Sequence, residues 1–168
     1  MALETVRARP LTVVLTSLSS DAHTWNLVYL QLVLEEMRCR VINLGACTPD
    51  ETILAACVTQ APDLLVISSI NGHGVHDGLR LIRALRAVPG LAALPAVIGG
   101  RLDATGGADR STAERLIDAG FDSVFEDAGG ITTFRSMVHR IAADAAVPDG
   151  GAQLDRSGSG SGEPIGAR

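Results

Sequence analysis

A carboxylate and an imidazole stand two residues apart early in the chain, as Asp21 and His23. In extended backbone, side chains two residues apart point to the same side, so these two groups can meet. A carboxylate that accepts one ring N–H fixes the tautomer of the imidazole and leaves its other nitrogen free, and more basic, to bind a metal. The pair is therefore a candidate metal ligand with its supporting acceptor. The same residues also fit an exposed loop histidine behind an aspartate that caps the next helix.

A zinc site held by protein ligands is poorly supported, because zinc needs three or four donors. His73 and His76 are the only other histidines expected nearby, and no pair of cysteines accompanies them. A macrocyclic cofactor that brings its own equatorial ligands needs a single protein donor, together with small residues where it meets backbone. Glycines that suit this need, and that also suit ordinary turns, are Gly72, Gly74, Gly99 and Gly100.

The elements that must position these residues alternate along the chain. Apolar runs rich in β-branched residues predict strands at 11–18, 41–44, 64–68, 96–98 and 123–125. Helical periodicity predicts helices over about 25–37, 75–88 and 133–143. Two further helices are predicted to begin at Pro49, with Thr48 as cap, and after the cap Ser111. Such alternation favours an α/β fold, flavodoxin-like or Rossmann-like, with a five-stranded parallel sheet in the order 2-1-3-4-5. The loops after the strands then share one edge, where ligands bind in such sheets.

Length and composition favour one domain. The chain has 168 residues, of which 46% are hydrophobic and 3% aromatic. We expect an N-terminal arm over 1–10, a folded domain over 11–144, and a flexible Gly/Ser-rich tail over 145–168. Along the helix predicted at 75–88, a row formed by Arg80, Arg83 and Arg86 is expected to face solvent.

Charge and hydropathy also exclude some partners. The 14 basic residues are all arginines and the net charge is -5, so nucleic acid is not expected as a partner. No apolar run approaches the roughly 20 residues of a membrane span, and 1–10 lacks the apolar stretch of a signal peptide. A cytoplasmic protein without a membrane partner is expected. Cys39, Cys47 and Cys57 lack paired spacing and are expected to be free thiols.

Three short motifs carry a resemblance to a known family. Asp21-x-His23, Ser68-x-Ile70 and Gly99-Gly100 resemble, in order and approximate spacing, the D-x-H-x-x-G, S-x-L and G-G signature of cobalamin (B12)-binding domains. The likeness covers roughly residues 11 to 143. Within that family, the segments 41–45, 48–51 and 68–74 resemble the small (sigma) subunits of glutamate mutase, also called methylaspartate mutase.

The resemblance implies that cobalamin binds base-off, with its dimethylbenzimidazole tail displaced and His23 as lower axial ligand of cobalt. Ser68 would meet a nitrogen of the tail base in a slot between sheet and helices. The loops 45–48 and 71–74 would face the corrin ring or a partner subunit. The residues implied to bind the cofactor are Asp21, His23, Thr24, Ser68, Ser69, Ile70, Gly72, Gly99 and Gly100.

Two positions depart from the signature. Ile70 replaces a leucine, which is a mild change. Asn26 replaces a glycine, and we expect it to preserve the turn, because asparagine tolerates left-handed backbone best among non-glycine residues. Trp25, just before it, fits either core packing or a place near the cofactor or a subunit interface.

The implied activity is that of an isomerase, an adenosylcobalamin-dependent mutase that converts L-glutamate to 3-methylaspartate through radicals. The organic chemistry belongs to the cofactor. No catalytic residue is expected in this chain alone, and a large barrel-type catalytic subunit is the implied partner in a hetero-oligomer. A non-catalytic corrinoid carrier or cobalamin-sensing module would use the same site, although methyl carriers often have a helical cap for which 1–10 leaves no room. A receiver domain of the same fold would need a lysine after the last strand, and the chain has none.

Overall fold

The computed structural model describes residues 9–103, 110–126 and 130–146. Its strands, all parallel, are β1 (Thr12–Thr16), β2 (Arg40–Asn43), β3 (Leu64–Ser68), β4 (Ala96–Gly99) and β5 (Ser123–Phe125). Its helices are α1 (Trp25–Glu36), α2 (Asp50–Gln60), α3 (Gly74–Ala87), the short 3-10 helix η1 (Pro89–Leu91), α4 (Arg110–Asp118) and α5 (Gly130–Ala146). The strand order is β2-β1-β3-β4-β5, which confirms the predicted fold class.

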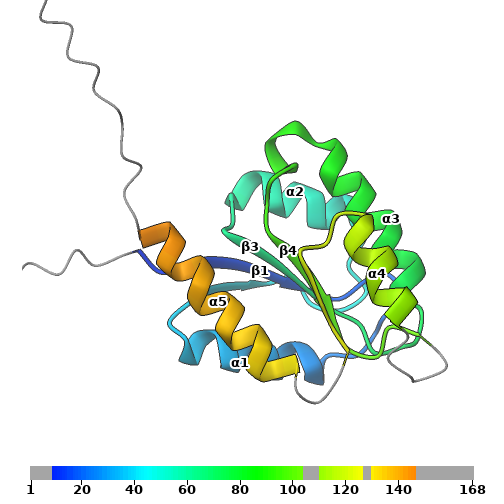
Figure 1. Ribbon diagram of the computed structural model, residues 1–168, viewed down its shortest axis with the longest axis horizontal. Coiled ribbons are helices and arrows are strands. Elements are labelled where there is room, and N and C mark those ends of the chain that lie inside the picture. Colours follow the sequence, from blue (N-terminus) through cyan, green and yellow to red (C-terminus); the bar gives the residue numbers. More distant parts are fainter. Residues whose placement is uncertain (1–8, 104–109, 127–129, 147–168) are drawn as a thin grey trace, which may run out of the picture.

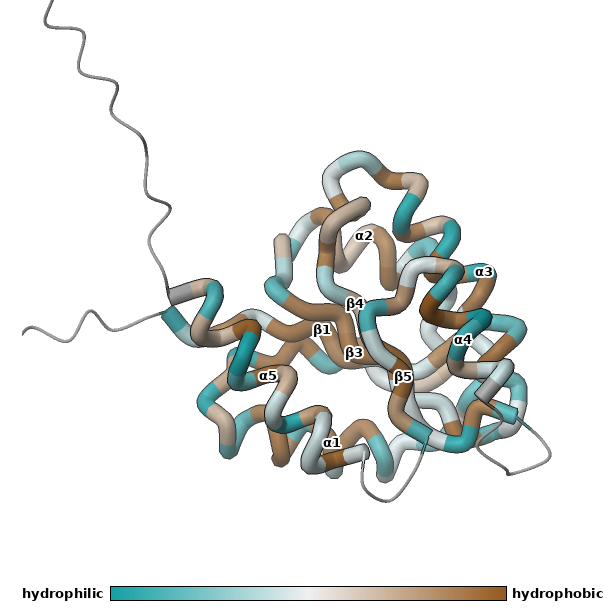
Figure 2. Tube along the Cα trace, in the orientation of Figure 1, coloured by the Kyte–Doolittle hydropathy of each residue, from teal (hydrophilic) through white to brown (hydrophobic). Residues whose placement is uncertain are grey.

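Helices cover both faces of the sheet (Figure 1). On one face α1 and α5 pack against alternate residues of β1 such as Val13 and Leu15, and on the other α2, α3 and α4 pack against Val14. Because both faces are covered, β1 and β3 are buried along their whole length, as expected for central strands of a parallel sheet. Figure 2 shows this as continuous hydrophobic colour through the central strands.

Some predicted boundaries and caps were wrong. Pro49 has an extended backbone with ψ 148° and precedes α2 instead of beginning it. The Thr48 hydroxyl donates to the carbonyl oxygen of Gly45 at 3.0 Å, so it closes the loop before α2 and caps no helix. Ser111 lies inside α4, which begins at Arg110. α5 continues to Ala146, two residues into the predicted tail, while 147–168 and most of the predicted arm lie outside the described residues.

The arginine row of α3 does not simply face solvent. Arg86 donates to the carbonyl oxygens of Leu94, at 2.6 Å, and Gly120, and pairs with Asp122, because its helix ends beside these loops. Arg80 pairs with carboxylates near the carboxyl edge of the sheet. The prediction of a solvent-exposed row therefore holds for Arg80 and Arg83, which are exposed, and is wrong for Arg86.

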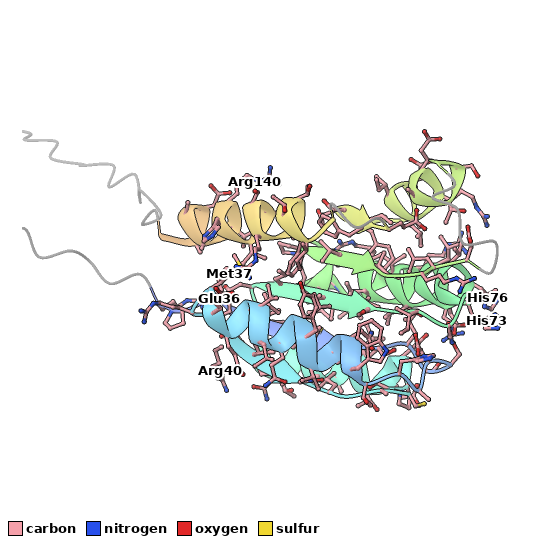
Figure 3. The ribbon with its side chains drawn as sticks, turned by 90° about the horizontal axis from the view of Figure 1, so that it is seen from below. Glu36, Met37, Arg40, His73, His76 and Arg140 are labelled. Atoms are coloured by element: carbon pink, nitrogen blue, oxygen red, sulfur yellow. The ribbon has the colours of Figure 1, made fainter. Side chains whose placement is uncertain are left out.

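The carboxyl ends of the strands lie at the end of the molecule that carries His73 and His76. Figure 3 shows His73 and His76 at one end of the molecule and Glu36, Met37 and Arg40 at the other. Since Arg40 begins β2, the histidines mark the end where the strands terminate. Among the helices of the described ranges, none has the length and apolar character to cross a membrane.

Candidate functional site

The predicted pair of Asp21 and His23 forms at the carboxyl edge of the sheet. Asp21 is fully buried, and its Oδ1 lies 2.7 Å from Nδ1 of the His23 ring and accepts the His23 backbone N–H at 3.0 Å. About half of the His23 side chain, 48%, remains exposed. A carboxylate at Nδ1 holds the proton on that nitrogen, so Nε2 keeps its lone pair for a metal. Among the described residues no cluster of three or more His, Cys, Asp or Glu could hold a metal.

Asp21 also ties two loops together. Its Oδ2 accepts the Ser69 hydroxyl at 3.0 Å and the Ile70 backbone N–H at 2.6 Å, so the loop after β1 is fixed to the loop after β3. Burial acts to raise the pKa of Asp21, but the hydrogen bonds from His23, Ile70 and Ser69 outweigh it and lower the pKa below its ordinary value. The carboxylate is therefore ionised at neutral pH and accepts from both loops.

A second group of contacts holds the loop before the pair. The Ser20 hydroxyl donates to Asp77 on α3 at 2.5 Å, and the Asn71 side chain donates to the Ser20 carbonyl oxygen at 2.8 Å. Arg80 joins Asp77, at 2.8 Å, to Asp50 at the start of α2. Two loops, after β1 and after β3, and two helices, α2 and α3, are thus linked behind His23.

Asp77 is expected to make the free energy of unfolding depend on pH in the acid range. Burial acts to raise the pKa of Asp77, but hydrogen bonds from Ser20, His76 and Arg80 lower the pKa below 3.8 overall. A carboxylate with a depressed native pKa stabilises the fold above its unfolded pKa and loses that contribution as pH falls through the native pKa. Wild type should exceed Asp77→Asn in free energy of unfolding by its largest amount above pH about 4, and this difference should shrink at lower pH. Urea unfolding over a pH series measures this, and a constant difference would contradict it.

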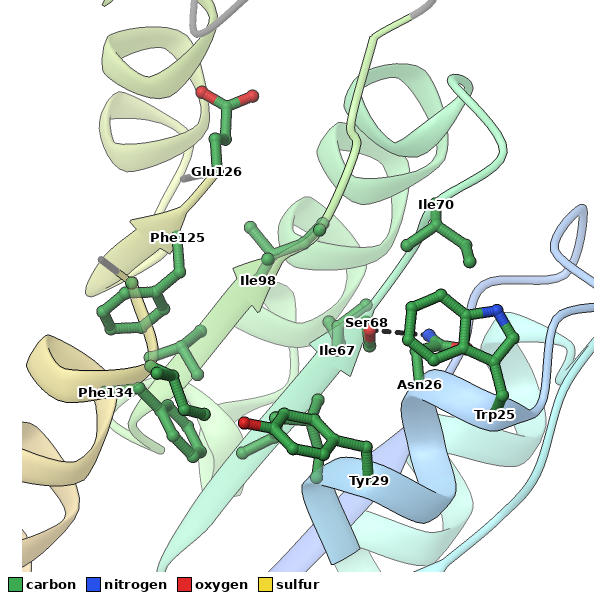
Figure 4. A pocket seen from close by; sticks show the side chains of 17 residues that line it. Trp25, Asn26, Tyr29, Ile67, Ser68, Ile70, Ile98, Phe125, Glu126 and Phe134 are labelled. Carbon is green, nitrogen blue, oxygen red and sulfur yellow. Dashed lines mark hydrogen bonds between the residues drawn. The ribbon is translucent and has the colours of Figure 1, made fainter. Parts of the chain in front are cut away.

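A cavity of about 350 Å³ opens beside the pair, between α1, α5 and the carboxyl ends of β3 and β4. Its walls are mainly apolar, with Trp25 and Tyr29 from α1, Ile70 from the loop after β3, and Phe125 and Phe134 from the far side (Figure 4). The two phenylalanine rings pack edge to face with centroids 5.7 Å apart. Because Ile70 lines the cavity and its N–H binds Asp21, the cavity and the His23 pair are joined by one residue.

Four of the predicted site residues meet in this cavity, namely Ser68, Ile70, Gly99 and Gly100. The other predicted residues lie outside it. Ser69 supports Asp21, Gly72 forms a turn with φ +82°, and Thr24 is an exposed residue directly before α1 whose side chain caps no backbone N–H.

The glycine pair is required by the packing of the chain itself. Gly100 has φ +115°, and a Cβ there would collide with the carbonyl oxygen of Ser69. A Cβ at Gly99 would lie 2.7 Å from the carbonyl oxygen of Phe125. These glycines let the ends of three strands approach closely, and the cavity floor depends on that approach.

Gly100→Ala is expected to lower the free energy of unfolding by about 2 to 4 kcal/mol, since it adds backbone strain to a collision with main chain. The matched control is Gly90→Ala, because a Cβ at Gly90 meets nothing within 4 Å and its φ is not positive. Urea unfolding of both variants measures the difference. Equal losses in the two variants would contradict the packing role of Gly100.

The sequence did not identify every residue of the cavity. Asn26 lies in α1 with helical backbone, so the expected left-handed turn was wrong, because α1 already begins at Trp25. Trp25 is 65% exposed and lines the cavity, which rules out core packing. Trp25 and Tyr29 stand four residues apart on one helix, a spacing that places both on one face and could have predicted them as a wall. The three cysteines are free, as expected.

Comparison with known proteins gives consistent matches. The sequence model of the B12-binding domain matches residues 11–129. The glutamate mutase sigma subunit of Halobacterium salinarum is 34% identical over 139 residues, which cover 82% of this chain and 89% of that protein. The glutamate mutase sigma subunit of Fusobacterium nucleatum is 29% identical over 114 residues, which cover 68% of this chain and 83% of that protein.

Solved structures show the same fold. A cobalamin-binding protein from Desulfitobacterium hafniense superposes with a TM-score of 0.65 at 17% identity, over 79% of this chain and 60% of that one. The methanol:cobalamin methyltransferase complex MtaBC from Methanosarcina barkeri gives 0.59 at 19% identity, over 81% of this chain and 50% of that one. A response regulator from Desulfuromonas acetoxidans gives 0.57 at 16% identity, over 79% of this chain and 97% of that one, so the fold alone does not select a ligand.

Proposed function

The chain belongs to the B12-binding domain family, and we propose that it is the small subunit of a glutamate mutase, carrying adenosylcobalamin base-off with His23 as lower ligand of cobalt. The observation that carries the proposal is the His23 ring held through Nδ1 by a buried carboxylate, beside a cavity joined to it by Ile70. The pair supplies the one donor that a corrinoid requires, and the cavity takes the displaced tail.

The residues of the cavity fit a planar heteroaromatic base. Trp25 and Tyr29 on one side and Phe125 and Phe134 on the other provide apolar and aromatic walls. Ser68 places a hydroxyl among them, which can donate to a ring nitrogen of the base. Gly99 and Gly100 line the same cavity, where their lack of a Cβ lets the ends of β3, β4 and β5 approach one another.

The work of this chain is to bind and orient the cofactor. When bound, the adenosyl cofactor supplies cobalt–carbon homolysis, which starts the radical rearrangement of L-glutamate to 3-methylaspartate. Asp21 holds the proton at Nδ1 of His23 and fixes the angle of the ring, so that Nε2 is presented at one position. The amino-acid substrate and the cover over the corrin are assigned to a large barrel-type catalytic subunit, so activity needs both chains.

The test combines the full-length chain, its large partner subunit and adenosylcobalamin. We expect the visible spectrum of the cofactor to change to the base-off, histidine-ligated form, and 3-methylaspartate to form from glutamate only with both proteins present. An unchanged spectrum at saturating cofactor with the partner present would refute cobalamin binding. A changed spectrum without product would refute the mutase assignment and favour a corrinoid carrier or sensing module.

A further inference from the structure

The loop that leads to Asp21 is held by α3. Ser19 and Ser20, the two residues before Asp21, both bond to that helix through their hydroxyl groups. Ser19 Oγ accepts from Arg80 at 3.1 Å, and Ser20 Oγ donates to Asp77 Oδ2 at 2.5 Å. The cavity is formed by α1, α5 and the strand ends, whereas α3 reaches the candidate site through this loop.

Asp77 is suited to hold this loop at a distance from the cofactor. It is only 6% exposed, which leaves little of it for direct contact with a cofactor or a partner subunit. Its Oδ1 accepts from Arg80 at 2.8 Å, so its Oδ2 is directed at Ser20, and Arg80 also pairs with Asp50 on α2. Apolar side chains of the same size often stabilise a fold as well as a buried ion pair does. The effect of the Asp77 pair is therefore to be sought in the geometry that it fixes.

We propose that Asp77 and Ser20 are positioning residues for His23, and that their hydrogen bond sets where the axial ligand stands at the edge of the sheet. The proposal rests on the proposed function and adds to it the residues that place the ligand. Asp21 fixes the angle of the His23 ring through Nδ1. The bond from Ser20 to Asp77 fixes the backbone one residue before Asp21, and so the place from which the pair extends.

Asn71, in the loop after β3, supports the same part of the backbone. Its Nδ2 donates to the Ser20 carbonyl oxygen at 2.8 Å and to Ser20 Oγ at 3.1 Å. Ser20 is thus held both at its hydroxyl and at its carbonyl group. Since Asp21 has its own bonds to Ser69 and Ile70, loss of the bond between Ser20 and α3 should loosen the pair without releasing it.

The test uses the full-length chain with its partner subunit and measures two quantities. Absorbance titration gives the dissociation constant of adenosylcobalamin, and electron paramagnetic resonance of saturating cob(II)alamin gives the fraction of cobalt that carries a histidine nitrogen. Ser20→Ala is expected to raise the dissociation constant about three- to tenfold, less than the 10- to 100-fold effect of a group bonded directly to a metal ligand, and to lower the histidine-ligated fraction. Ser20→Thr keeps the hydroxyl at an exposed position and should behave as the wild type.

A double variant tests whether Asp77 acts through Ser20. Asp77→Ala is expected to weaken binding at least as much as Ser20→Ala, and the double variant should bind no more weakly than Asp77→Ala alone, because both changes remove the same bond. The matched control is Ser136→Ala, which removes an exposed hydroxyl that donates within its own helix, to the carbonyl oxygen of Thr132 at 3.1 Å. It should leave both quantities unchanged.

The outcomes separate the two proposals. Ser20→Ala that matches Ser136→Ala in both measurements would overturn the positioning role, while a histidine-ligated wild type would leave the proposed function intact. Additive losses in the double variant, or a loss that Ser20→Thr shares, would overturn the bond to Asp77 as its basis. A wild type without histidine ligation would overturn both proposals together. Circular dichroism checks folding, and the two Ser20 variants decide the matter if Asp77→Ala does not fold.

Discussion

His23→Ala is expected to abolish the histidine-ligated spectrum of bound cobalamin and to reduce mutase activity below detection. In the proposed complex a corrinoid leaves a single lower position for the protein, so loss of the His23 donor would remove the only bond from the protein to the metal. Loss of a group that only hydrogen-bonds to a metal ligand lowers metal affinity or activity about 10- to 100-fold. Loss of the ligand itself should therefore have a larger effect. The measurement is the absorbance titration of the chain with its partner, followed by assay of 3-methylaspartate.

The matched control is His139→Ala, because His139 is exposed on α5 and does not line the cavity. Electron paramagnetic resonance of the cob(II)alamin form adds a direct readout, since ¹⁵N-labelled histidine in the wild type changes the nitrogen splitting of the cobalt signal. The same splitting in His23→Ala would contradict the assignment. Equal loss of activity in His139→Ala would show a general effect on folding and would contradict it as well.

The sheet could be predicted from the sequence because its strands are short β-branched runs with polar residues at their ends. The limits of β3 and β5 agree with the predicted 64–68 and 123–125. Strand order followed from right-handed crossovers with few alternatives. The caps could not be predicted as well, because a helix start is decided by the backbone angle of one residue, such as ψ 148° at Pro49.

The candidate site was predictable where its contacts are local. Asp21 and His23 are two residues apart, and their hydrogen bond follows from that spacing. The contact of Asn26 with Ser68 joins positions 42 residues apart, and no spacing rule indicates it. The glycine of the family signature suggested a left-handed turn at Asn26, but α1 begins at Trp25, so Asn26 has helical backbone in its first turn.

The contacts of Asp21 require a hydrogen-bond acceptor at both side-chain oxygens, which a carboxylate provides and an amide does not. Each of its oxygens accepts a different backbone N–H, from His23 on Oδ1 and from Ile70 on Oδ2. An asparagine in either orientation would place an NH2 group against one of these N–H donors. The usual conservative substitution therefore puts two donors in contact at a position that is fully buried.

Asp21→Asn is accordingly expected to lower the free energy of unfolding by about 2 to 4 kcal/mol, and Asp21→Ala by about 3 to 5 kcal/mol, since alanine leaves all the donors unpaired. The loss should also release the His23 ring and weaken histidine ligation of cobalamin about 10- to 100-fold. Urea unfolding measures the first effect and absorbance titration the second. Asp144→Asn, at an exposed position of α5, controls for the change of charge. If Asp21→Asn matched this control in both measurements, the carboxylate would be neither the anchor of the two loops nor the group that orients His23.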